Sequence, residues 1–172
     1  MYISKNINIK KLLLSISFLS ALFLVAGCSE QKKTIDGEFH LGNFGADWKE
    51  GSFHLVVPIE WIGDSSITIK SIEFIKRDGA PITFEEDGID YEVFGADPMK
   101  SSGIYTEPNL GIVSNINSLE IKDEGKIVFL FSLNDVEKDS ERRVKIKFDS
   151  NGEEFEKVVV WNTLEELTTY HN

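Results

Sequence analysis

The ten residues from 52 to 61, SFHLVVPIEW, alternate between large apolar side chains and a mixed set, which is the two-residue period of a β-strand. One face of this strand would carry only apolar residues: Phe53, Leu55, Val57, Ile59 and Trp61. The opposite face would carry His54, Val56, Pro58 and Glu60. Because proline has no N–H to donate to a neighbouring strand, Pro58 predicts that this strand lies at a sheet edge or is bulged at that residue.

Four later segments also have the composition of strands. Residues 66–76 alternate, but their apolar phase changes near Lys70 and Ser71, which predicts a β-bulge or a crossing between sheets. Residues 126–133 and 143–148 alternate without a break, and residues 155–161 are rich in valine. Between the last two segments, Asn151 and Gly152 readily take the positive φ angles of a two-residue hairpin turn.

Short strands separated by turns, with no alternating helices, are typical of an antiparallel β-sandwich. We therefore expect an all-β fold, an antiparallel immunoglobulin-like β-sandwich that occupies residues 36–172 after an N-terminal signal segment. Its core should include Trp61, Ile69, Phe129 and Phe148. The stretch TLEELTTY that begins at Thr163 predicts a terminal helical turn, capped by Asn162 or Thr163.

The first 27 residues have the composition of an export signal. They carry three lysines and no acid, and an almost uninterrupted apolar run extends from Leu12 to Val25. This run of 14 residues is shorter than the roughly 20 that a helix needs to span a bilayer. It ends in the small residues Ala26 and Gly27, so a cleavage site fits the segment better than a transmembrane helix does.

The chain's single cysteine follows this run directly, in the sequence Val25-Ala26-Gly27-Cys28. These four residues resemble the lipobox of bacterial lipoproteins. The resemblance implies that Cys28 receives a thioether-linked diacylglycerol and that cleavage before Cys28 makes it the first residue of the mature protein. Residues 1–27 would then be a lipoprotein signal peptide and residues 28–35 the lipidated cysteine with a polar tether. A plain secretory signal and an uncleaved membrane anchor remain the alternatives.

The residue after Cys28 and the amino-acid composition indicate the kind of cell envelope in which the protein lies. Ser29 stands where an Asp would retain some lipoproteins in a Gram-negative inner membrane. Lysine is far more abundant than arginine, as in proteins from AT-rich genomes. We therefore expect a lipid-anchored protein on the outer face of the cell membrane, in a Gram-positive envelope, with the lipid bilayer as its partner through acylated Cys28.

The net charge of the mature chain favours some classes of partner and disfavours others. Removing residues 1–27, with their three lysines, takes the formal net charge from −11 to −14. Nucleic acid would be repelled, since its binding needs a basic surface. The same balance favours a basic or cationic envelope partner, whether a basic peptide or a metal ion.

Sequence patterns for catalysis and metal binding are missing. A nucleophilic triad needs a serine or cysteine beside a histidine and an acid, and His40, His54 and His171 stand in no such motif. His54 alternates with the apolar face of its strand and should face solvent. DSNGEE, from Asp149, begins like a calcium loop, but its glycine is at the wrong position for an EF-hand. We expect a protein that is not an enzyme and holds no resident cofactor.

One acidic segment remains as a candidate binding site. Residues 85–110, EEDGIDYEVFGADPMKSSGIYTEPNL, hold seven acids, one base and three aromatic residues. Their glycines and prolines predict that much of the segment is loop, where binding residues tend to lie. The candidate ligand or partner residues are Asp87, Asp90, Tyr91 and Glu92. They would engage a basic partner or hold calcium through oxygen ligands, or the segment would be an ordinary connection between strands.

These observations favour a membrane-anchored envelope lipoprotein with a noncatalytic binding or interaction domain. The alternatives are an envelope enzyme of unknown reaction and a purely structural surface protein.

Overall fold

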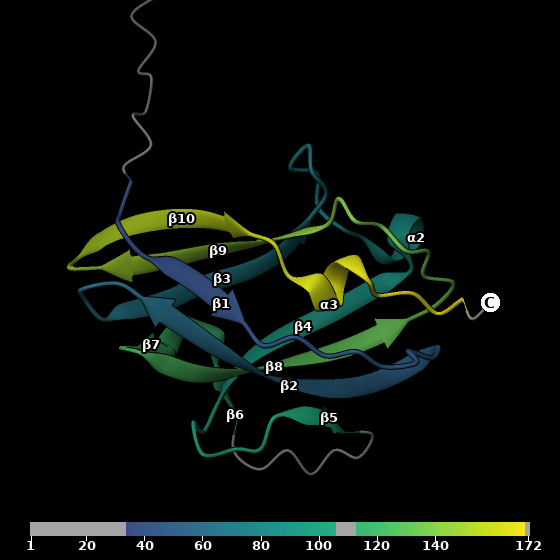
Figure 1. Cartoon of the computed structure of the whole chain (residues 1–172), viewed down its shortest axis with the longest axis horizontal. Coiled ribbons are helices and arrows are strands. Elements are labelled where there is room, and N and C mark those ends of the chain that lie inside the picture. The colour runs from purple at the N-terminus through teal and green to yellow at the C-terminus, as the bar shows by residue number, and fades with distance from the viewer. Residues whose placement is uncertain (1–33, 106–112, 171–172) are drawn as a thin grey trace, which may run out of the picture. The chain divides into compact units, whose positions relative to one another are not determined.

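Two antiparallel β-sheets make up the computed structural model, which describes residues 34–105 and 113–170 (Figure 1). The first sheet has the strand order β1 (Glu38–Leu41), β2 (Gly51–Ile62), β8 (Glu124–Leu133), β4 (Ile89–Ala96) and β6 (Val113–Asn115), with β5 (Gly103–Tyr105) also paired to β2. The second has the order β10 (Glu153–Val159), β9 (Arg143–Ser150), β3 (Ile67–Ile75) and β7 (Glu120–Ile121). The expectation of an all-β sandwich is confirmed at this level.

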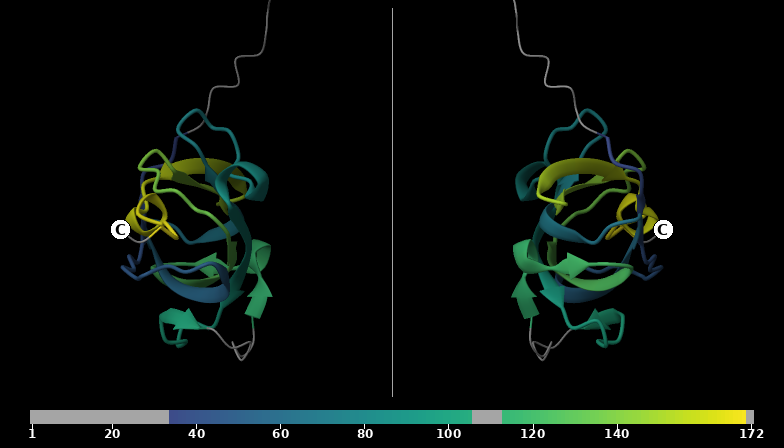
Figure 2. Two further views of the ribbon diagram at one scale, coloured as in Figure 1. Left: turned by 90° about the vertical axis from the view of Figure 1, so that its right-hand side faces the viewer. Right: turned by 90° about the vertical axis from the view of Figure 1, so that its left-hand side faces the viewer.

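Among the described residues, three single helical turns connect or follow the strands: α2 (Phe84–Asp87), the 3₁₀ turn η2 (Ile116–Ser118) and α3 (Asn162–Glu165). Figure 2 gives two end views, and its left view faces the end of the sandwich where α2 lies. Within the described part of the chain, no helix is both long and apolar enough to cross a membrane.

Strand β2 has the two faces that its alternation predicts. The predicted apolar face is buried throughout, and β2 pairs along most of its length with β8. Val56 on the opposite face is also buried, because Ala96 and Val128 pack against it in a second small apolar cluster that includes Phe94 and Tyr105. This face is therefore covered locally by the segment that follows β4.

Pro58 lies in a strand with neighbours on both sides, so the prediction of an edge strand is wrong for β2 as a whole. On one side β8 is continuous, but on the other β1 pairs only with residues 59–62 and β5 only with residues 54–56. Pro58 falls in the gap between them. The Gly42 N–H donates to the Pro58 carbonyl at 2.9 Å, and the Gly42 carbonyl accepts from Trp161 Nε1 at 2.9 Å. The indole supplies the donor that proline lacks.

The predicted bulge and hairpin turn are both present. The register of β3 against β9 shifts between Ile69 and Ser71, where the apolar phase changes in the sequence. Asn151 and Gly152 have φ angles of 52° and 80°, and they join β9 to β10. Both φ angles are positive, as a two-residue type I′ turn requires.

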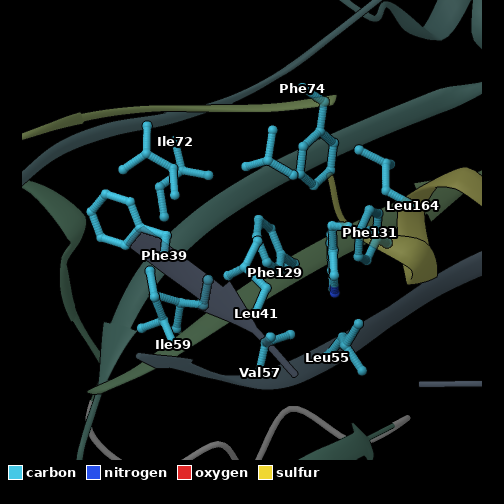
Figure 3. Close-up of a cluster of buried hydrophobic side chains, with 14 of the residues drawn as sticks. Phe39, Leu41, Leu55, Val57, Ile59, Ile72, Phe74, Phe129, Phe131 and Leu164 are labelled. Carbon is cyan, nitrogen blue, oxygen red and sulfur yellow. The ribbon is translucent and has the colours of Figure 1, made fainter. Parts of the chain in front are cut away.

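The core between the sheets combines aromatic rings with aliphatic side chains (Figure 3). All four residues expected there, Trp61, Ile69, Phe129 and Phe148, belong to one buried cluster. Trp161, which follows β10, stacks on Phe129 with a centroid separation of 5.2 Å and also contacts Phe74. The segment after the last strand thereby closes one side of the core.

The expected cap of the terminal helical turn is wrong. The N-cap position of α3 is Trp161, whose side chain makes no capping hydrogen bond, and Asn162 is already helical. Thr163 is buried and holds another segment instead: its Oγ1 accepts from the Phe44 N–H at 2.7 Å. Tertiary contacts, not local capping, position this turn.

Candidate binding site

The acidic segment is more ordered than its composition predicts. Glu85 to Asp87 lie in α2, and residues 89–96 form β4, which pairs with β8 on one side and β6 on the other. The prediction that much of this segment is loop is wrong for these residues. In IDYEV, from Ile89, the apolar and aromatic residues alternate with Asp90 and Glu92, so β4 has one core face and one acidic face. Residues 106–110 lie outside the described residues.

Asp87 is held by its own chain. Its Oδ2 accepts from the Thr83 N–H at 2.9 Å, and its Oδ1 lies 3.3 Å from Lys76 Nζ. Thr83 Oγ1 in turn accepts from the Glu86 N–H, which completes a reciprocal cap at the start of α2. Asp87 therefore fixes the position of α2.

Tyr91 faces the core and not a ligand surface. Its ring stacks on Phe74 with a centroid separation of 4.1 Å, and its hydroxyl accepts from the Phe74 N–H at 2.7 Å. Burial raises the pKa of the Tyr91 hydroxyl. Asp90 and Glu92 are exposed on the opposite face of β4, so the four predicted binding residues do not share one surface.

Tyr91→Phe is expected to lower the free energy of unfolding by roughly 1 to 3 kcal/mol, because it leaves the Phe74 N–H without an acceptor in a half-buried place. Urea unfolding monitored by circular dichroism measures the change. Tyr105→Phe is the matched control: its hydroxyl donates to the Ser101 carbonyl at an exposed position. An equal loss in both variants would contradict a special role for Tyr91.

The raised pKa of Tyr91 also predicts how stability depends on alkaline pH. A hydroxyl whose pKa is higher in the folded than in the unfolded protein stabilises the fold fully below the unfolded value, near 10, and loses this contribution as pH rises through the folded value. The unfolding midpoint of the wild type should therefore fall more steeply above about pH 10 than that of Tyr91→Phe. Parallel alkaline limbs for the two proteins would rule out Tyr91 as the titrating group.

A cavity of about 520 Å³ lies where α2 meets the connection between β8 and β9. Glu86 and Asp87 line it from α2; Asp135, Glu137, Lys138, Asp139 and Arg142 line it from the connection. Only Asp87 belongs to the set predicted from sequence. Most of the other lining residues lie in NDVEKDSER, residues 134–142. The acidity of this connection between two clear strands is the sequence feature that could have indicated them.

Backbone contacts hold the two sides of the cavity together. The Asn134 N–H donates to the Gly88 carbonyl at 2.9 Å, and both Gly88 and Asp135 have positive φ angles, 67° and 50°. Further along, Val136 and Thr169 exchange hydrogen bonds of 2.9 and 3.0 Å. The connection is thus tied to α2 at one end and to the C-terminal segment at the other.

Arg142 is buried beside the cavity and is only 2% exposed. Its guanidinium donates to three backbone carbonyls, those of Glu137, Leu164 and Leu167. Burial lowers the pKa of Arg142, whereas the negative charges of Asp139 and Asp87 act in the opposite direction. Its Nε is buried and has no hydrogen-bond partner among the described residues.

The cavity lining has a net negative charge, with five acids against Lys138 and Arg142. Lys76 is paired with Glu86 and Asp87, and Lys138 is paired with Glu166. Asp135, Glu137 and Asp139 form no ion pair within the described part of the chain. The negative charge of Asp135, followed by burial and by Glu137, raises the pKa of the neighbouring Tyr170 hydroxyl.

Neither His40 nor His54 lines this cavity. His40 is exposed on β1, with its ring nitrogens 3.7 Å from Glu38 and 3.5 Å from Glu60. His54 is only partly exposed, and its Nδ1 is buried without a partner among the described residues. In residues 34–105 and 113–170, no group of three or more His, Cys, Asp or Glu side chains is arranged to hold a metal ion. His171 and Cys28 lie outside the described residues.

The sequence matches no protein-family model, and the search of curated proteins likewise finds no match.

Proposed function

We propose that this chain is a lipoprotein, anchored through acylated Cys28 to the outer face of the cell membrane of a Gram-positive envelope. Its β-sandwich, which we propose is of the immunoglobulin-like type, is a noncatalytic binding or interaction domain. The lipobox-like sequence supports the anchor, and the two antiparallel sheets support the type of sandwich. The domain binds no nucleic acid, because its charge is strongly negative.

The observation that carries the binding function is the position of the acidic cavity relative to the start of the domain. Glu38, near the start, pairs with Ile62 at one end of β2. Gly51, at the other end, pairs with Leu133, which directly precedes the cavity-lining connection. Because a strand rises about 3.3 Å per residue, β2 separates these two ends by about 35 Å. The cavity therefore lies at the end of β2 opposite to the start of the domain.

The anchor is tested by Cys28→Ala in the full chain. Two acyl chains hold a protein on a bilayer durably, so the wild type should partition into the detergent phase and the variant into the aqueous phase. Ser29→Ala is the matched control, because it changes the next residue and leaves the cysteine. Mass spectrometry of the native protein should find an acylated Cys28 at the N-terminus. A native N-terminus at Met1, or unchanged partitioning of Cys28→Ala, would overturn the proposal.

A further inference from the structure

We propose that the cavity between α2 and residues 134–142 binds a basic peptide segment, with a lysine or arginine side chain placed among Asp135, Glu137 and Asp139. This inference rests on the proposed binding function and names the class of partner. Three kinds of observation support it: acids without an ion-pair partner, a buried unsatisfied donor on an arginine that lines the cavity, and exposed aromatic rings near these acids.

The charges of the cavity are divided unequally. The acids of α2 already have a cation, since Lys76 Nζ lies 2.8 Å from Glu86 and 3.3 Å from Asp87. The three acids of the connection have none in ion-pair contact among the described residues. Arg142 attracts Asp139 from within the lining, but five acids against Arg142 and Lys138 leave the lining negative. Like charges held close together repel each other, and a cation placed among them relieves this repulsion. A cationic group is therefore favoured most on the side formed by residues 135–139.

Arg142 indicates that the ligand is more than a bare cation. It lines the same cavity, is almost fully buried, and has a buried Nε that no described residue satisfies. An N–H donor needs an acceptor, which a metal ion cannot provide. A peptide segment carries both groups: a cationic side chain for the three acids and backbone carbonyls for a donor.

Exposed aromatic residues stand beside the acids. Phe84 is 47% exposed on α2, in the same helical turn as Glu86 and Asp87. Tyr170 is 55% exposed, and the negative charge of nearby Asp135 is the main cause of the raised pKa of its hydroxyl. The aliphatic stems of lysine and arginine pack on such rings, and their cationic ends are attracted to the ring faces. The volume of about 520 Å³ lies within the range of sites that enclose a group of this size.

The test measures peptide binding to the full chain, purified from membranes in detergent, by isothermal titration calorimetry. The probe is a short acetylated and amidated peptide of alternating lysine and serine. The same peptide with glutamine in place of lysine is the negative control, and calcium chloride is titrated separately. The wild type should bind the lysine peptide and not the glutamine peptide, with an affinity that falls as salt is added.

The cavity variant combines Asp135→Asn, Glu137→Gln and Asp139→Asn. These changes remove charge but keep shape and hydrogen bonding: the amide oxygen introduced at position 139 can still accept from the Glu141 N–H, and asparagine tolerates the positive φ at position 135. Peptide binding should weaken about tenfold or more, because the three carboxylates would touch the cationic side chain directly. The matched control combines Asp64→Asn, Asp123→Asn and Glu154→Gln, the same charge change outside the cavity lining, and should weaken binding by less than about twofold.

Three results would overturn the inference: no binding of the lysine peptide by folded wild type, equal weakening in the two triple variants, or calcium binding that the cavity variant abolishes while the peptide does not bind. If the triple variant were unfolded by circular dichroism, Glu137→Gln alone would be compared with Glu154→Gln by the same criteria. The partitioning of Cys28→Ala is independent of all these results. A protein that is lipid-anchored but does not bind the peptide would refute the inference and leave the anchor in place.

Discussion

Gly88→Ala is expected to lower the free energy of unfolding by about 3 kcal/mol, from left-handed backbone strain and steric overlap together. Gly88 follows α2 with a φ of 67°, and a Cβ built there would lie 1.9 Å from the Asn134 carbonyl oxygen. That oxygen belongs to the backbone that begins the cavity-lining connection. It cannot move away without disturbing the Asn134–Gly88 hydrogen bond.

Gly152→Ala separates the two causes. Gly152 also has a positive φ, 80°, but a Cβ there would meet no atom within 4 Å. This variant should therefore show only the backbone cost, about 1 kcal/mol. Urea unfolding of both variants measures the difference. Equal losses of unfolding free energy at the two positions would show that the short distance from position 88 to the Asn134 carbonyl oxygen adds no steric cost.

The two variants also differ in where the damage should appear. Gly152 lies in the hairpin turn between β9 and β10, whereas Gly88 joins α2 to the connection that lines the cavity. Gly88→Ala should therefore also weaken lysine-peptide binding in the calorimetric assay, and Gly152→Ala should not. Loss of binding in both would point to a general loss of structure.

Much of the fold follows from the period of the sequence. In β2 and β8 the apolar residues alternate without a break, so the strands, their buried faces and the core residues Trp61 and Phe129 could be predicted. The bulge in β3 was equally visible, because a shift of one residue exchanges the two faces of a strand. These features depend on neighbours in sequence.

Features that depend on distant neighbours were missed. Strand β4 was not predicted, because the charges of Asp90 and Glu92 indicated a loop. These two acids stand at alternate positions, as they would on any strand with one solvated face. The cavity joins α2 to residues some fifty positions later, and no local pattern indicates that pairing. Likewise Arg142 and Arg143 are adjacent and identical in type, yet only Arg142 is buried.

The burial of Arg142 leads to the second prediction. Arg142→Met should lower the free energy of unfolding by roughly 3 to 5 kcal/mol, because three carbonyls lose a charged donor and methionine of similar length offers no replacement. Removing the cost of burying a charge works in the opposite direction. That gain is smaller than the loss at this site. The three partners are neutral backbone carbonyls held in place by the fold, and they cannot reorient to bond water when the donor is removed.

Arg77→Met is the matched control. Arg77 is an arginine whose side chain is 78% exposed, and its partner is one carboxylate, that of Glu141. An exposed ion pair of this kind contributes about 1 kcal/mol or less. Chemical denaturation should therefore separate the two variants clearly. Similar values for both would mean that the carbonyls around Arg142 find other donors.

Hydrogen exchange should show where the Arg142→Met protein loosens first. Arg142 bridges the 134–142 connection, through Glu137, to the segment after β10, through Leu164 and Leu167. The amides of Val136 and Thr169, which bond across the same two segments, should exchange faster than in the wild type. Amides in the centre of β2 and β8 should exchange more slowly than these two, because their hydrogen bonds lie in the core of the sheet. Uniform acceleration across all these amides would show that Arg142 stabilises the whole domain and does not act as a local clamp beside the cavity.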